Sequence, residues 1–325
     1  MSRSTKIVCT LVLLALLCFY PLMVGRFHVY LLTECMIYSL FGVSFYLLLG
    51  HTGLLSFGHA AYFGVGAYAT ALCLRHLPAV PLPLALLLGA VSGLLSGFLI
   101  GLMILRLTKI YFSFATLSNG QMLWAIAWKW RSFTGGDDGL TGWSSRMIAV
   151  PWIGTFSLNN VIFLYYLVFI IATSCILLCW YFTRTPLGST LSNIKSNAER
   201  ASFLGINVAL AKLILFTVAG MMAGVSGSLF ILFKKMASPN FLDLFMSFDI
   251  VIISVIGGFS SFLGPIVGSF IHVYMVEYLS SWTESWPLLM GGFFVLRILF
   301  FPRGLVGLIQ AVSRKPAFLR GTVRP

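Results

Sequence analysis

The sequence predicts an all-α polytopic membrane protein: a bundle of about ten transmembrane helices, with Gly- and Pro-interrupted or re-entrant segments near 241–292. Of the 325 residues, 59% are hydrophobic and 9% are charged, against roughly 45–50% and 25% in soluble domains. Mean hydropathy is +0.98. Nearly charge-free stretches of helical length recur along the chain, and a helix of about 20 apolar residues crosses a bilayer. A soluble globular domain, a disordered chain and a coiled coil are therefore excluded.

Ten charge-poor windows mark the expected helices in order. They are 7–24, 29–50, 53–74, 82–105, 110–128, 159–183, 213–233, 243–257, 262–280 and 286–301. Glycines and prolines interrupt the last three windows, for example at Gly257, Gly264, Pro265 and Pro287. The first window lacks the small-residue cleavage site that follows a signal peptide, so we interpret it as a retained anchor.

The domain organisation follows from these windows and from the charges between them. We expect one transmembrane domain over 1–310, with an external loop at 131–158 and a polar segment at 184–212, and then a basic tail at 311–325. The predicted inner segments contain one acid, Glu199, and these basic residues: Arg3, Lys6, Arg106, Lys109, Arg184, Lys195, Arg200, Lys212, Arg303, Arg314, Lys315, Arg320 and Arg324. The other acids lie in outer segments or at outer span ends, so the positive-inside rule places both termini in the cytoplasm. Lys234 and Lys235 run against this bias.

The net charge of +13 does not indicate nucleic-acid binding, because the basic residues flank apolar spans. The cysteines show no CxxC spacing, and the histidines and acids are scattered along the chain. We therefore expect no catalytic residue, no metal and no cofactor.

Small residues at four-residue spacing predict close helix packing. They form three groups: Gly93, Gly97 and Gly101; Gly220 and Gly224; Gly264 and Gly268.

Polar residues inside the spans suggest where a substrate path lies, because a polar side chain facing lipid is costly. The candidates are Ser56, His59, Thr116, Asn119 and Gln121. Two alternatives remain open: the cluster at 116–121 is equally typical of a hydrogen-bonded clasp between helices, and a lone histidine such as His59 is more typical of packing. The predicted topology places no carboxylate near the middle of a span, with Glu34, Asp249 and Glu277 toward outer ends. This counts against a proton-coupled carrier.

The polar segment at 184–212 contains a predicted amphipathic helix over 191–204. Its apolar side consists of Leu191, Ile194, Ala198, Ala201 and Leu204, and Gly205 provides a natural stop. Such a helix either rests on the membrane surface or docks a cytoplasmic partner.

Several segments resemble the LivM-type permease subunits of bacterial ABC importers for branched-chain amino acids. The resembling stretches, in family order, are 50–68 (from Gly50-His51-Thr52-Gly53 to Tyr68), 130–140, 184–188, 199–207 and 301–307. The resemblance implies coupling to an ATPase through Glu199, Arg200, Gly205 and Asn207. Many ABC permeases have Glu-Ala-Ala where this chain has Glu-Arg-Ala-Ser.

The resemblance also implies partners: a sister permease, two cytoplasmic ATPases and a periplasmic or extracellular substrate-binding protein, in the bacterial inner membrane. The sequence contains no G-x-x-x-x-G-K-[ST] loop, so we expect ATP hydrolysis on other chains. Branched-chain amino acids are the expected substrates. Importers of urea, short amides or aromatic acids share the same framework, and an ion-coupled secondary carrier is a more distant alternative.

Overall fold

The structure is a computed structural model. It describes residues 17–21, 23–77, 80–107, 109–143, 147–150, 154–157, 160–259 and 261–300. Most of the first predicted window, the resembling stretch at 301–307 and the basic tail at 311–325 lie outside these residues.

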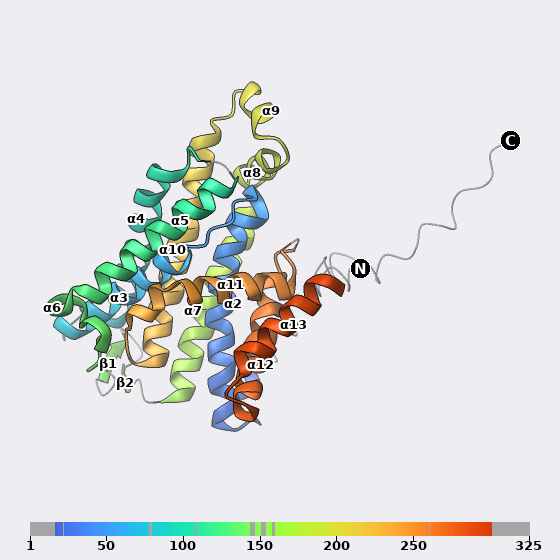
Figure 1. Ribbon diagram of the computed structural model, residues 1–325. Helices are drawn as coiled ribbons and strands as arrows, with labels where there is room; N and C mark the ends of the chain where they lie inside the picture. Colours follow the sequence, from blue (N-terminus) through green and yellow to red (C-terminus); the bar gives the residue numbers. More distant parts are fainter. Residues whose placement is uncertain are drawn as a thin grey trace.

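The described chain is helical apart from its loops and one hairpin (Figure 1). The long helices are α2 (Arg26–Thr52), α3 (Ala60–His76), α4 (Leu82–Ile104), α5 (Lys109–Lys129), α7 (Val161–Thr183), α10 (Val208–Lys234), α11 (Leu244–Gly257), α12 (Gly264–Trp282) and α13 (Trp286–Phe300). The short ones are α6 (Arg131–Thr134), α8 (Pro186–Ser196), α9 (Ala198–Phe203) and the 3₁₀ turns η1 (Gly136–Asp138) and η2 (Pro239–Leu242). Strands β1 (Met147–Val150) and β2 (Gly154–Ser157) pair antiparallel, so the expected external loop contains a hairpin.

Most helix bounds agree with the predicted windows. Two windows differ. Helix α10 begins at Val208 rather than at residue 213. In the third window, 53–74, the chain leaves α2 at Gly53, which has a φ of 70°, and becomes helical again only at Ala60. Among the residues that the structure describes, four helices, α2, α4, α7 and α10, are long and apolar enough to cross a membrane. The count of about ten crossings is therefore not confirmed.

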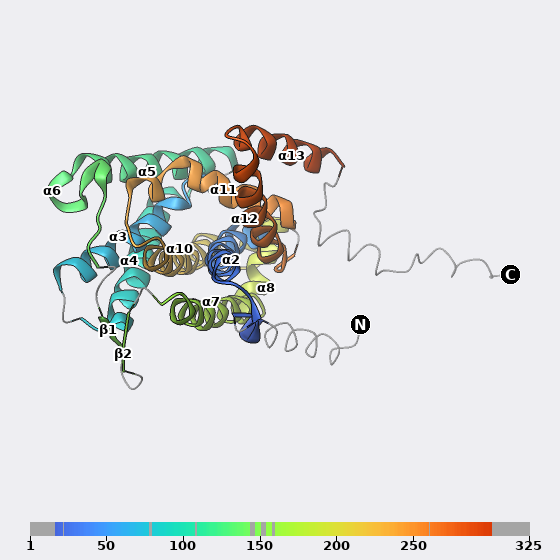
Figure 2. The same ribbon diagram turned by 90° about the horizontal axis from the view of Figure 1, so that it is seen from below.

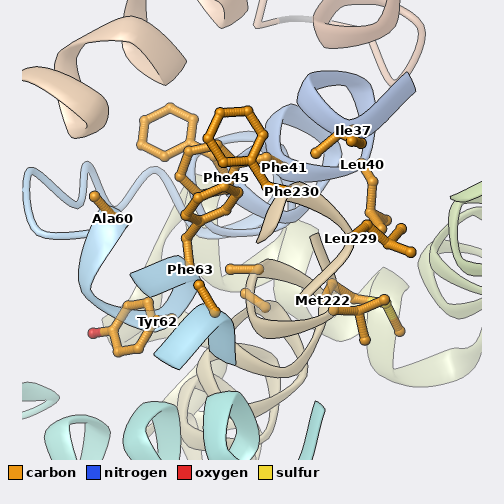
Figure 3. Close-up of a cluster of buried hydrophobic side chains, with 14 of the residues drawn as sticks. Ile37, Leu40, Phe41, Phe45, Ala60, Tyr62, Phe63, Met222, Leu229 and Phe230 are labelled. Carbon is orange, nitrogen blue, oxygen red and sulfur yellow. The ribbon is translucent and has the colours of Figure 1, made fainter. Parts of the chain in front are cut away.

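Helix α2 lies at the centre of the bundle. Of its most apolar 18 residues, 89% are buried, and α7, α10, α11 and α12 pack around it. Figure 3 shows the aromatic part of this core, where Phe41 and Phe63 lie with ring centroids 4.6 Å apart and Phe63 also contacts Phe230 of α10. Lipid therefore reaches little of α2.

Glycines allow α3, α4 and α10 to approach backbone to backbone. A Cβ atom added at Gly93 would lie 2.6 Å from the Gly220 carbonyl oxygen, and one at Gly66 would clash with the Cα of Gly224. The predicted close packing of these groups is confirmed, and the same holds for Gly268, whose added Cβ would meet the Ile253 carbonyl. Burial of apolar surface does not drive helix association in lipid, so such close contacts are the main source of cohesion.

Helices α5, α11 and α13 lie along one side of the bundle, with α12 beside them (Figure 2). In Figure 1, α11 lies across the bundle near mid-height, steeply inclined to α2. At 14 residues it is about 21 Å long at 1.5 Å per residue, which is shorter than the hydrocarbon core. This part of the chain matches the interrupted segments expected near 241–292.

The two ends of the bundle differ. Helices α8 and α9 lie at one end, and α6 and the β1–β2 hairpin lie toward the other (Figure 1). At the hairpin end, the Lys234 ammonium lies 2.9 Å from the Glu34 carboxylate. This ion pair gives a physical reason why Lys234 runs against the charge bias.

The Gly-rich loop after α6 is held at the same end as Lys234. The backbones of Leu140 and Ala237 exchange two hydrogen bonds, of 2.8 and 2.9 Å, and Trp143 is fully buried. Asp137 and Asp138 remain exposed.

Candidate functional site

The loop at 53–59 joins α2 to α3 at the α8 end of the molecule. It contacts α5, and the first residue of α3 contacts α11. The Ser113 hydroxyl of α5 donates to the Leu55 carbonyl at 2.7 Å, and the Phe57 amide donates to the Thr116 hydroxyl at 3.2 Å. A Cβ at Gly58 would clash with the Thr116 carbonyl. On the α11 side, the Ala60 amide donates to the Ser247 hydroxyl at 3.1 Å. Thr116 thus takes part in a hydrogen-bonded clasp, which was the alternative to a substrate path for the cluster at 116–121.

Ser56 and His59 are fully buried in this chain. The Nε2 of His59 lies 2.9 Å from the Ser44 hydroxyl, and its ring stacks on Phe41 with centroids 5.5 Å apart. The Ser56 hydroxyl and the His59 Nδ1 have no hydrogen-bond partner among the described residues. The packing interpretation fits His59, and a role of these two residues in a substrate path stays a prediction.

Asn119 and Gln121 lie farther along α5 and are half-buried. The Asn119 amide nitrogen donates to the Ala115 carbonyl of its own helix at 2.8 Å, and neither side chain joins the Thr116 clasp. Ser118 beside them is exposed, and Met122 helps to line a shallow open depression. The structure therefore separates the predicted cluster into a buried clasp and a polar open side.

Asp249 lies on α11, which runs along the same side of the bundle as α5 (Figure 2). Its side chain is 41% exposed, and its Oδ1 is 3.7 Å from Nε2 of the buried His272 on α12. The predicted topology places Asp249 toward the outer end of its window. Because α11 lies across the bundle (Figure 1), position within that window does not give depth, and the expectation that no carboxylate lies near the middle of a span stays a prediction. We call Ser118, Asn119, Gln121 and Asp249, with their exposed apolar neighbours Phe114, Met122, Phe245 and Phe248, the α5–α11 surface.

The predicted amphipathic helix at 191–204 is two helices, because α8 ends at Ser196 and α9 begins at Ala198. Between them Asn197 is extended, with φ −160°, and its side chain accepts from the Arg200 amide at 2.9 Å. A local side-chain cap of this kind competes with continuation of the helix. Thr185 caps α8 in the same way, and Asn207 caps α10.

The buried side of this segment is shorter than predicted. Leu191, Ile194 and Ala201 are buried, but Leu204 is 76% exposed, because α9 has ended at Phe203 and Gly205 turns the chain with φ +80°. Glu199 and Arg200 are exposed, and a Cβ at Gly205 would meet no atom within 4 Å. Phe203, which is 83% exposed, was not among the predicted site residues. Its exposure could have been predicted from the two adjacent large apolar residues that directly precede Gly205 in a polar segment.

One hydrogen bond joins α8 to the end of α2, just before the 53–59 loop. The Lys195 ammonium of α8 donates to the Gly50 carbonyl at the end of α2, at 2.9 Å. The carbonyl is one of the last four of the helix, which have no intrahelical donor, and a cation is favourable at this end of a helix. The segment at 184–212 is thus linked to α2 and, through the following loop, to α5 and α11.

Comparison with known proteins gives a family match over most of the chain. The family described as "Branched-chain amino acid transport system / permease component" matches residues 27–301. The high-affinity branched-chain amino acid transport system permease proteins LivM of Salmonella typhimurium and Escherichia coli are each 27% identical to it, over 88% and 90% of this chain and 72% and 73% of the relatives.

A more distant relative, the autoinducer 2 import system permease protein LsrC of Photorhabdus laumondii, is 26% identical over 73% of this chain and 69% of that protein. No solved structure gives a significant match. The chain is a membrane protein and belongs to the family of permease components of branched-chain amino acid transport systems.

Proposed function

We propose that this chain is the transmembrane subunit of an ATP-binding-cassette importer that moves branched-chain amino acids across the bacterial inner membrane. Partner ATPases drive its helices between outward and inward access. The chain itself contributes no catalytic residue, metal or cofactor, and hydrolysis takes place on the partner chains.

The observation that carries this proposal is the exposed tip at 203–205. Two large apolar side chains, Phe203 and Leu204, are 83% and 76% exposed beside the exposed Glu199 and Arg200. An aromatic anchor with a polar rim is the usual composition of a docking contact between proteins. We assign the ATPase as its occupant, because the tip lies in the segment that resembles the family's coupling region.

The contacts behind the tip supply a route into the membrane helices. Lys195 holds the end of α2 through Gly50, and the loop at 53–59 then bonds to Thr116 of α5 and, through Ala60, to Ser247 of α11. A conformational switch requires differential contacts in its two states. A movement of α8 and α9 can thus be transmitted to the α5–α11 surface through these hydrogen bonds.

The same assignment implies the arrangement around the chain. The α8–α9 end faces the cytoplasm, as do both termini, and the Gly-rich loop with the β1–β2 hairpin faces outward, where a substrate-binding protein docks. A sister permease covers the α5–α11 surface, and Asn119, Gln121 and Ser118 lie along the path. The bilayer surrounds the remaining faces.

Substrate choice rests on the family and on the LivM relatives. Urea, short amides and aromatic acids are alternatives, and the relative named for autoinducer 2 import indicates that this fold accepts other ligands. An ion-coupled carrier is a second candidate function, favoured by the Asp249–His272 pair, since such groups serve as proton relays in carriers. Uptake driven by an ion gradient without any ATPase would establish it.

The test is uptake and ATPase stimulation by the reconstituted complex after the double change Phe203→Ala and Leu204→Ala. We expect both activities to fall at least tenfold, because truncating anchors of this kind typically costs about 2 kcal/mol or more in an interface. Leu77→Ala, at a leucine that is 53% exposed near the opposite end, is the control and should change neither activity.

A second arm replaces Glu199 by Gln and Gly205 by Val in separate variants. Val at Gly205 strains the turn, because φ is +80° there and β-branched residues avoid that region. If all these variants keep full coupling, the tip does not transmit ATPase closure and the assignment is wrong.

A further inference from the structure

The surroundings of the Asp249 carboxylate would favour a bound cation. No hydrogen bond to it is found among the described residues, and its distance of 3.7 Å to His272 Nε2 is too long for one. A carboxylate accepts up to about four hydrogen bonds. With 41% of its side-chain surface exposed, it has unused acceptor capacity that a ligand outside this chain can reach.

The partner of Asp249 is rigidly placed. His272 is 5% exposed, lies next to the Tyr38 ring at 6.2 Å between centroids, and has an Nδ1 with no hydrogen-bond partner in the described part of the chain. The Tyr38 hydroxyl is in turn 3.8 Å from the Met246 sulfur on α11. The buried His272 therefore lies on one side of the Asp249 carboxylate, and the exposed part of the carboxylate remains accessible to a ligand.

Apolar side chains flank the carboxylate on its own helix. Phe245 and Phe248, four residues and one residue before Asp249, are 76% and 39% exposed, and Phe248 packs edge-on against Phe57 with centroids 5.8 Å apart. The surface thus presents one carboxylate between apolar side chains. A ligand with a cationic group and a hydrocarbon chain would pair the cation with Asp249 and pack the hydrocarbon against Phe245 and Phe248.

We propose that Asp249 binds the α-ammonium group of the transported amino acid during passage, with Phe245 and Phe248 against its aliphatic side chain and His272 as a positioning residue. This inference rests on the proposed function, since it takes the substrate to be an amino acid. It adds a recognition group to the expected substrate path, whose candidate residues did not include Asp249. An ionisable group at membrane depth is expensive and usually serves a site.

The experiment uses the reconstituted complex and radiolabelled leucine as the probe. Asp249→Asn should lower the maximal uptake rate at least tenfold, while ATPase stimulation by the binding protein and co-purification of the sister permease stay at the level of the unmodified complex. Asp249→Glu should restore at least part of the uptake, because it keeps the charge. His272→Gln should reduce uptake less than Asp249→Asn.

The matched control is Asp243→Asn, the same chemical change on the same helix. Asp243 Oδ1 accepts from the Leu244 amide at 2.6 Å as the N-cap of α11, and Asn caps as well as Asp. Its uptake should be unchanged.

Three results would overturn the inference. Uptake that Asp249→Asn leaves intact shows that the carboxylate does not bind the ammonium group. Loss of the sister permease on purification shows that its occupant is a basic residue of that chain. Equal loss of uptake and ATPase stimulation shows a general defect. By contrast, a complex that does not import leucine even without substitutions contradicts the proposed function itself.

Discussion

The open surfaces of α4 and of α5 with α11 differ in chemistry. Every exposed residue of α4 is apolar, as follows: Pro83, Leu84, Leu87, Leu88, Val91, Leu95, Phe98, Leu99, Leu102 and Met103. Its half-buried Ser92 and Ser96 bond to carbonyls of their own helix. The α5–α11 surface instead combines exposed aromatics with Ser118, Asn119, Gln121 and the Asp249 carboxylate.

This difference indicates which side of the bundle faces lipid and which side faces protein or water. Hydrocarbon accepts the α4 surface without cost, whereas a carboxylate at that depth is costly unless water or protein meets it. We therefore expect the uniformly apolar α4 surface to face lipid, and the α5–α11 surface, where polar groups interrupt the apolar side chains, to face protein or water.

The largest effect should come from placing a charge on each surface. Leu95→Asp on α4 should reduce the free energy of unfolding by about 2.5–3.5 kcal/mol, the cost of an acid facing the membrane centre. Met122→Asp on α5 should cost clearly less, although Met122 and Leu95 are matched at 53% and 51% exposure. Denaturant titration of the purified complex with its sister permease, in bicelles, measures both. Equal losses would mean that both surfaces face lipid.

A smaller effect should separate the two sides of α4 itself. Gly93→Leu forces a side chain into the backbone of α10, where an added Cβ would already lie 2.6 Å from the Gly220 carbonyl, and overpacking typically costs about 1–3 kcal/mol. Val91→Leu on the exposed side should be neutral, within about 0.5 kcal/mol. The same titration measures both variants, and a neutral Gly93→Leu would contradict the close α4–α10 packing.

Helix existence and most helix bounds followed from the sequence, because long charge-free windows leave few alternatives in a bilayer. The glycine contacts between α4 and α10 were predictable for the same reason, since spacing alone puts Gly93 and Gly97 on one side of a helix. The start of α3 was not predictable from hydropathy, because the apolar loop before Ala60 is as lipid-like as a helix. Its conformation depends on bonds to Thr116 and Ser247, which are distant in sequence.

The candidate site was predicted in part. The position of Gly205 as a stop was right, but the break at Asn197 and the exposure of Leu204 depended on a local side-chain cap that outweighed the 3.6-residue period. The depth of Asp249 stays a prediction, because it was inferred from position within a window, whereas α11 lies across the bundle. Its partner His272 is on the next helix, so their meeting required the α11–α12 packing.

The central claim is that the α5–α11 surface faces protein or water while the α4 surface faces lipid. The most direct test introduces single cysteines at Ser118 and Leu95 and measures labelling by a membrane-impermeant maleimide in the reconstituted complex, relative to the unmodified chain. We predict labelling at 118 that substrate or ATP cycling changes, and none at 95. Labelling at 95 that equals or exceeds labelling at 118 would contradict the account.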